Sequence, residues 1–128
     1  MTPDDRQYTQ SHEWVRVEGE EALVGITDHA QDALGDITFV ELPEPGQTFE
    51  QGEECGVIES VKAASDLFMP IGGQVTEVNR HLEDEPEIIN RDPYDDGWIF
   101  KIKGIDADEA EALMDAQQYG ERLDRDEA

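Results

Sequence analysis

Short runs of alternating hydrophobic and polar residues recur along the chain and predict a protein built mainly from β-strands. The expected strands are residues 14–17, 22–24, 37–42, 55–58, 67–70, 74–79 and 98–103. The first two flank an acidic segment that contains Gly19, which is typical of a hairpin turn. The polar, Pro-containing residues 80–96 are expected to form a surface loop. Many short strands separated by turn signals favour a β-sandwich or a barrel-like sandwich.

Two helices are expected to interrupt this pattern. A short internal helix begins with Thr27 or Asp28 as its N-cap and ends at Gly35. A second helix lies near the C-terminus, where residues 106–109 resemble a capping box and Gly120 is expected to end or kink the helix. Four residues form one face of this second helix at helical spacing: Ala110, Leu113, Met114 and Gln117.

The length of the chain fits a single domain over residues 1–128, with flexible ends expected at residues 1–7 and 122–128. No stretch approaches the roughly 20 apolar residues that a membrane span needs. The first residues also lack the features of a secretory or organelle-targeting signal. The single cysteine, Cys55, allows no internal disulfide and is expected to be a buried thiol without a redox role. We therefore expect a soluble, cytoplasmic monomer that does not bind membranes.

The charge of the chain is strongly unbalanced, with 33 acidic residues against 9 basic ones and a formal net charge of −24. Nucleic acid is a poor partner for such a protein, because phosphate binding depends on Lys and Arg. The carboxylates are spread throughout the chain, which indicates a solvated acidic surface. Their mutual repulsion weakens the folded state unless salt screens it, so the composition suggests a halophilic source.

Lys62 is one of only three lysines, and it alone has no simple structural explanation. Lys101 and Lys103 alternate with apolar residues of the strand expected at 98–103, so they should point outward. Lys62 instead lies between two strand-like runs that must be joined by a tight turn, and three small residues follow it. Such a turn exposes the amine and leaves room for a modifying enzyme, which makes Lys62 a candidate site of acylation.

Seven short blocks, in order, resemble the glycine cleavage system H-proteins. They are SHEWV at residues 11–15, GITDHAQ at 25–31, LGD at 34–36, VELP at 40–43, ESVKA at 59–63, INRDPY at 89–94 and GW at 97–98. The resemblance extends over residues 8–119, nearly the whole chain. The adjacent glycines at 72–73 depart slightly from the family pattern, without affecting the lysine motif.

The resemblance implies a lipoyl/biotinyl-type β-sandwich, also called a barrel-sandwich hybrid, with lipoic acid in amide linkage on Lys62. It implies a non-catalytic carrier that takes an aminomethyl group from the glycine decarboxylase (P-protein) to the aminomethyltransferase (T-protein). Dihydrolipoamide dehydrogenase (L-protein) then reoxidises the arm. A lipoate-attaching enzyme is the fourth implied partner.

The resemblance also implies a cleft beside the His-Glu-Trp block that can receive the loaded arm. Glu13 is the candidate residue there, because a carboxylate attracts a protonated amine. Asp66 is a second candidate for the same cleft. For both residues the alternative is an ordinary solvated carboxylate.

Other functions are less consistent with the sequence. Biotin carriers usually place the lysine between two methionines, and lipoyl domains of 2-oxoacid dehydrogenases normally belong to longer acyltransferases. A hydrolase would need a base paired with Ser60 or Ser65, and no Gly-x-Ser-x-Gly elbow is present. A purely structural protein remains an alternative that the modification state of Lys62 would test.

The remaining aromatic and histidine residues have structural interpretations. His12 and His29 lack a nearby cysteine or spaced histidine, so hydrogen bonding is favoured over metal binding. Five aromatic residues are expected in the sandwich core: Trp14, Phe39, Phe68, Trp98 and Phe100.

Overall fold

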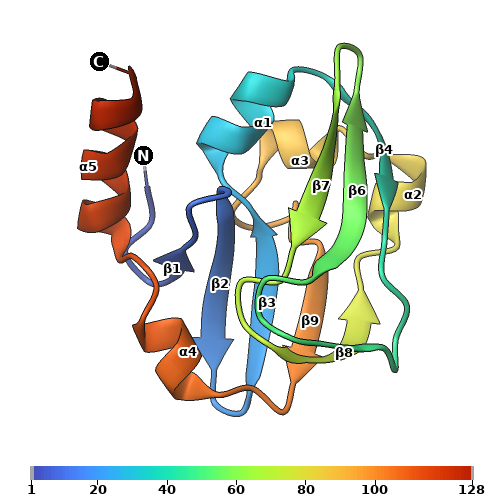
Figure 1. The fold of residues 1–128 in the computed structure, drawn as a ribbon. Helices are drawn as coiled ribbons and strands as arrows, with labels where there is room; N and C mark the ends of the chain where they lie inside the picture. Colours follow the sequence, from blue (N-terminus) through green and yellow to red (C-terminus); the bar gives the residue numbers. More distant parts are fainter. Residues whose placement is uncertain (1, 128) are drawn as a thin grey trace.

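Two β-sheets form the body of the molecule, as the computed structural model shows for residues 2–127, with side chains described through residue 124 (Figure 1). The larger sheet has the strand order β1-β2-β3-β9-β8-β5, and the smaller has the order β4-β6-β7. The strands are β1 (Gln7–Tyr8), β2 (Glu13–Glu18), β3 (Glu21–Ile26), β4 (Ile37–Glu41), β5 (Thr48–Phe49), β6 (Glu54–Ser60), β7 (Ala64–Phe68), β8 (Gly73–Val78) and β9 (Phe100–Lys103). All strand pairs are antiparallel, and the mainly β class is confirmed.

The main core lies between the two sheets. It includes Val15 and Val24 from the larger sheet and Ile58 and Leu67 from the smaller one. A second, smaller cluster of Tyr8, Trp14 and Tyr119 covers the other face of the larger sheet. β2 therefore has buried residues on both faces, because Trp14 and Val15 point in opposite directions.

Trp14 explains why a glycine lies opposite it on β3. Trp14 and Gly25 are direct cross-strand partners, and a Cβ added to Gly25 would lie 2.6 Å from the indole ring. The indole cannot move aside easily, because it is buried and its Nε1 donates a hydrogen bond to the Pro93 carbonyl at 3.0 Å. The close approach of ring and backbone thus requires glycine.

The short internal helix α1 (Asp28–Leu34) is confirmed with the expected boundaries. Thr27 is the N-cap, and its hydroxyl accepts a hydrogen bond from the Ala30 N–H. Gly35 ends the helix with φ 82, and its N–H donates to the Gln31 carbonyl.

Two expectations about the loops and the C-terminus are wrong. Residues 80–96 contain two short helices, α2 (His81–Asp84) and α3 (Ile88–Arg91), which bury Leu82 and Ile89. The single C-terminal helix is two helices, α4 (Ala107–Glu111) and α5 (Ala116–Glu127), and Gly120 lies inside α5. No helix in the described part of the chain is long and apolar enough to cross a membrane.

The aromatic residues are only partly where the sequence predicted them. Trp14 and Phe100 are buried, whereas Phe68 and Trp98 are half-buried. Phe39 is 51% exposed, so its assignment to the core is wrong. Cys55 is buried, as expected, and burial raises the pKa of its thiol to about 12.

Candidate functional site

Lys62 lies at the tip of the β6–β7 hairpin, which projects at the top of Figure 1. The strands stay paired up to Glu59 and Ala64, and Val61, Lys62 and Ala63 at the tip are exposed. Ser60 closes the turn, because its hydroxyl oxygen accepts from the N–H groups of Lys62 at 3.3 Å and Ala63 at 3.1 Å. The predicted turn is confirmed, and its hydrogen bonds fix the backbone position of Lys62.

The tip is also fastened to the end of α1. The Val61 N–H donates to the Asp36 carbonyl at 3.0 Å. A Cβ added to Gly35 would lie 3.2 Å from Cε of Lys62, so the lysine methylenes pass close over this glycine. The LGD block of the sequence thus supports both the helix end and the lysine.

Glu13, at the start of β2, is buried with 2% exposure, so the interpretation as a solvated carboxylate is wrong. Its carboxylate accepts hydrogen bonds from the hydroxyls of Thr9 and Ser11 and from the Phe68 N–H at 3.3 Å. Burial raises the pKa of Glu13, and these hydrogen bonds oppose the rise. The sequence analysis named Glu13 as a candidate residue of the cleft, but it did not identify Thr9 and Ser11 as the residues that donate hydrogen bonds to its carboxylate.

A cleft of about 510 Å³ opens beside Glu13. It lies between the turn that precedes β2 and the end of β7, and it joins residues far apart in the sequence. Its lining residues are Thr9, Gln10, Ser11, Glu13, Gln51, Gly52, Phe68, Met69, Pro70 and Leu113. One buried carboxylate at a largely apolar cleft is suited to an apolar chain that ends in a cation.

Asp66 does not line this cleft, but it lies on the way to it. Alternate residues of a strand face the same side, so Asp66 shares a face of β7 with Phe68, and it lies between the tip and the cleft. The side chain of Asp66 is exposed. Its negative charge is the main cause that raises the pKa of Glu54, on the neighbouring strand β6.

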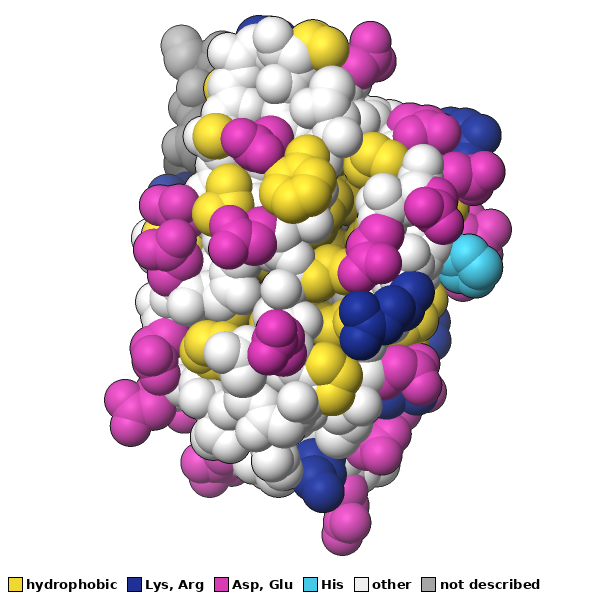
Figure 2. Space-filling view, turned by 90° about the vertical axis from the view of Figure 1, so that its right-hand side faces the viewer, with side chains coloured by type: hydrophobic (Ala, Val, Ile, Leu, Met, Phe, Trp, Pro, Cys, Tyr) yellow, Lys and Arg dark blue, Asp and Glu magenta, His cyan; other side chains and the backbone are white. Residues whose placement is uncertain are grey.

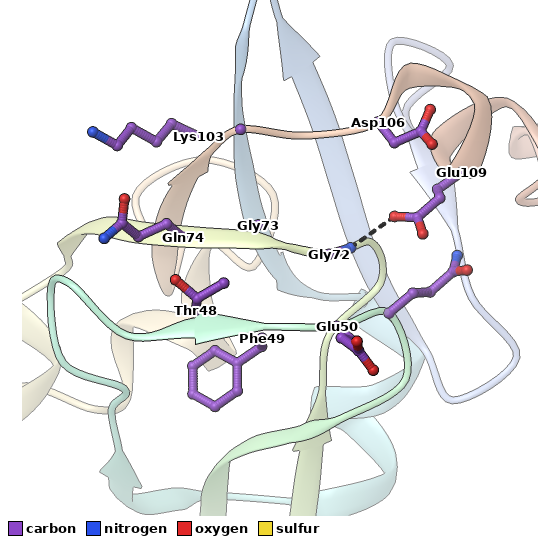
Figure 3. A pocket seen from close by; sticks show the side chains of 11 residues that line it. Thr48, Phe49, Glu50, Gly72, Gly73, Gln74, Lys103, Asp106 and Glu109 are labelled. Carbon is purple, nitrogen blue, oxygen red and sulfur yellow. Dashed lines mark hydrogen bonds between the residues drawn. The ribbon is translucent and has the colours of Figure 1, made fainter.

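A larger groove of about 720 Å³ lies at the other end of the molecule, between β5, β8 and α4 (Figure 3). Glu109 of α4 accepts a hydrogen bond there from the Gly72 N–H at 2.9 Å. Glu109 therefore ties α4 to the start of β8. Asp106 caps α4, because its carboxylate accepts a hydrogen bond from the Asp108 N–H at 2.9 Å. In Figure 1, β8 and α4, which border this groove, lie at the bottom of the molecule, opposite the projecting tip of the β6–β7 hairpin.

His12, next to Glu13, and His29, on α1, form an aromatic group with Tyr119 of α5. Nδ1 of His12 lies 2.8 Å from the Tyr119 hydroxyl, and the His12 and His29 rings lie 4.7 Å apart. The Tyr119 hydroxyl also lies 2.7 Å from the Thr27 hydroxyl. This network connects α5 with the N-cap of α1, and hydrogen bonding is the role that the structure gives to His12.

Comparison with known proteins gives a consistent result. The family model for the glycine cleavage H-protein matches residues 6–126. The chain is 53% identical over 122 residues to the glycine cleavage system H protein of Thermus thermophilus, and the match covers 95% of each chain. It is 54% identical over 126 residues to the glycine cleavage system H protein of Marinobacter nauticus, and this match covers 98% of this chain and 97% of the relative. The crystal structure of a glycine cleavage system H protein from Mycobacterium marinum is similar with a TM-score of 0.86 and 41% identity, over 94% of this chain and 98% of that one. This likeness confirms the expected lipoyl-type β-sandwich.

Proposed function

Because the chain belongs to the glycine cleavage H-protein family, we propose that Lys62 carries lipoic acid and that the protein shuttles an aminomethyl group in glycine cleavage. The observation that carries this proposal is the exposed lysine at the tip of a braced hairpin. The partners are the glycine decarboxylase, the aminomethyltransferase, dihydrolipoamide dehydrogenase and a lipoate-attaching enzyme. The protein is a carrier, and its partners supply the catalysis.

The residues around Lys62 fit a covalently attached arm. An exposed, neutral lysine amine can attack an activated lipoyl carbonyl, after which the activating group leaves and the nitrogen loses a proton. The hairpin then holds the base of the arm, so the group at its end stays locally concentrated near each docked enzyme. When attached, the lipoyl group supplies a disulfide that accepts the aminomethyl group and a dithiol that is afterwards reoxidised.

The cleft beside Glu13 fits the end of a loaded arm. Phe68, Met69 and Leu113 offer apolar contacts that exclude water from the chain of the arm. The Glu13 carboxylate attracts the protonated amine, and its bonds from Thr9 and Ser11 keep it pointed in one direction. Asp66 adds negative charge on the path between Lys62 and this cleft.

The carrier function predicts a covalent product. Incubating the lipoylated chain with glycine and a purified glycine decarboxylase should open the lipoyl disulfide and release carbon dioxide. The arm should gain the mass of one aminomethyl group on one sulfur and one hydrogen on the other. The unlipoylated chain should gain nothing under the same conditions. Intact-protein mass spectrometry measures both, and a lipoylated chain that gains no mass with an active decarboxylase would contradict the proposal.

Glu13→Gln is expected to release the aminomethyl group to solvent about tenfold faster, which corresponds to about 1.4 kcal/mol of lost attraction. Glutamine keeps the size of the side chain but loses its charge. Because burial raises the pKa of Glu13, the difference should shrink as the pH falls through that pKa and the wild-type carboxyl becomes neutral. Ammonia release followed over time at several pH values measures it.

Glu20→Gln is the matched control, since Glu20 is exposed in the β2–β3 turn, outside the cleft. It should release at the wild-type rate. Lipoylation of Glu13→Gln should be normal, and an unchanged release rate at neutral pH would remove Glu13 from the proposed role.

A further inference from the structure

Two large hydrophobic side chains stand out on the described surface, and both flank Lys62. Phe39 is 51% exposed and Val61 is 68% exposed. Val61 precedes the lysine at the hairpin tip, and Phe39 lies on β4, directly opposite Glu59 of β6. Side chains as exposed as these contribute little to the packing of the core, and they are available for contact with another molecule.

Phe39 belongs to the outer face of the three-stranded sheet. Strand pairing aligns Phe39 with Glu59 and Ala64 in one row, and Glu41 with Val57 and Asp66 two rows further on. Alternate rows face the same side of a sheet, so both rows belong to this face. Residues in one row point to the same side of the sheet. Beside Phe39 the surface is hollowed into a groove of about 660 Å³, lined by Val40, Leu42, Pro43 and Pro45 among others.

This face is uniformly acidic around its apolar residues. No Lys or Arg occurs in β4, β6 or β7, while Glu41, Glu54, Glu59 and Asp66 are exposed there. Glu41 and Asp66 both contribute to raising the pKa of Glu54, which shows that these carboxylates repel one another.

Figure 2 shows the side of the molecule on which β4 lies, with hydrophobic patches between acidic side chains. Arg80, at the rim of the groove, already pairs with Glu83 at 3.1 Å. Uncompensated carboxylates around an exposed aromatic ring are complementary to a partner surface with an apolar pocket and a basic rim.

Building on the function proposed above, we propose that this outer face of β4, β6 and β7 is the docking surface of the enzyme that attaches lipoate to Lys62. The enzyme presents an apolar pocket for Phe39 and Val61, and Lys or Arg side chains opposite Glu41, Glu59 and Asp66.

The size of an interface supports this assignment. A protein interface of standard size covers about 800 Å² of each partner, equivalent to a disc of about 16 Å radius. Phe39 is paired with the residue three positions before Lys62, so it lies about 10 Å from the lysine along the strand. An enzyme that encloses the lysine amine therefore covers Phe39 as well.

The attachment of lipoate and the later reactions of the arm take place at different atoms, so the enzymes must reach different parts of the protein. In attachment the reacting atom is the lysine nitrogen itself, so the enzyme must touch the hairpin tip. The other partners act on the far end of the arm, and the cleft for that end lies at the β7 edge of this sheet, across from β4. The attaching enzyme is thus the partner that must meet Phe39 and Val61 closely.

The test measures lipoylation kinetics of the full-length, unmodified chain with a purified lipoate–protein ligase, lipoate and ATP. Phe39→Ala should lower kcat/KM about tenfold or more, mainly through KM, and Phe39→Leu should recover most of the loss. Glu41→Lys should also raise KM, whereas Glu20→Lys, with the same charge change at the remote β2–β3 turn, should not. Melting temperatures of the variants would show that they are folded.

The outcomes separate this proposal from the function on which it rests. If the ligase does not modify the wild-type chain at Lys62, the carrier function itself fails. If it modifies the wild type and Phe39→Ala equally well, the docking surface is wrong and the carrier function stands. If Phe39→Ala leaves lipoylation unchanged but slows aminomethyl loading by the decarboxylase, the face serves another partner and the assignment to the attaching enzyme is overturned.

Discussion

Lys62→Arg is expected to abolish lipoylation of the intact chain. Arginine keeps the positive charge and a long side chain, but its guanidinium stays protonated and offers no amine for acylation. The position is exposed at a turn held by Ser60 and by the Val61–Asp36 bond, so the fold should be unaffected. Intact-protein mass spectrometry after treatment with a lipoate–protein ligase, lipoate and ATP should show no added lipoyl mass.

Lys101→Arg and Lys103→Arg are matched controls, because they make the same change at the only other lysines. Both residues belong to β9, within a continuous strand of the larger sheet. Each variant should gain one lipoyl group at the wild-type rate. A lipoyl group that still appears on Lys62→Arg would show that another residue accepts it.

The lysine hairpin could be predicted because the information for it is local. Two strand-like runs and the small residues between them specify the turn, and Ser60 within the same segment supplies its closing hydrogen bonds. The helix from Asp28 to Leu34 was predictable for the same reason, since Thr27 and Gly35 are adjacent to its ends.

Phe39 shows where periodicity fails. A bulge lies between Ile37 and Phe39 in the pairing of β4 with β6, so the inward-facing residues are Ile37 and Val40, three positions apart. An alternating pattern cannot be continued across an extra residue, because every later side chain changes face. The sequence alone therefore gives no sign that Phe39 is exposed, and the alternating pattern places it in the core.

The C-terminus shows a tertiary contact overriding a helical pattern. The chain leaves helical geometry between α4 and α5, where Met114 exchanges two backbone hydrogen bonds with Tyr8, at 2.8 and 3.1 Å. This pairing with a residue more than a hundred positions away has no local signal. The cleft beside Glu13 has the same character, because Thr9, Phe68 and Leu113 meet only in the folded chain.

The excess of acidic residues has little compensation in the folded protein. Of 33 carboxylates against 9 basic residues, most can have no cationic partner. The ion pairs among the described side chains, such as Arg16 with Glu18 at 2.6 Å and Arg80 with Glu83 at 3.1 Å, are mainly exposed ones. Exposed pairs contribute little stability, so long-range repulsion between carboxylates acts against the compact state.

We therefore expect the melting temperature to rise steeply between low salt and molar potassium chloride. The screening length falls from about 30 Å at 0.01 M, comparable with the size of the domain, to about 3 Å at 1 M, which removes most of the repulsion. Sodium chloride should act equally, because screening depends on ionic strength. Glu54→Gln, which relieves the repulsion by Asp66 and Glu41, should raise the melting temperature more at low salt than at molar salt. Melting curves at fixed pH and protein concentration decide this, and a midpoint that stays flat or falls with added salt would show that charge repulsion does not limit stability.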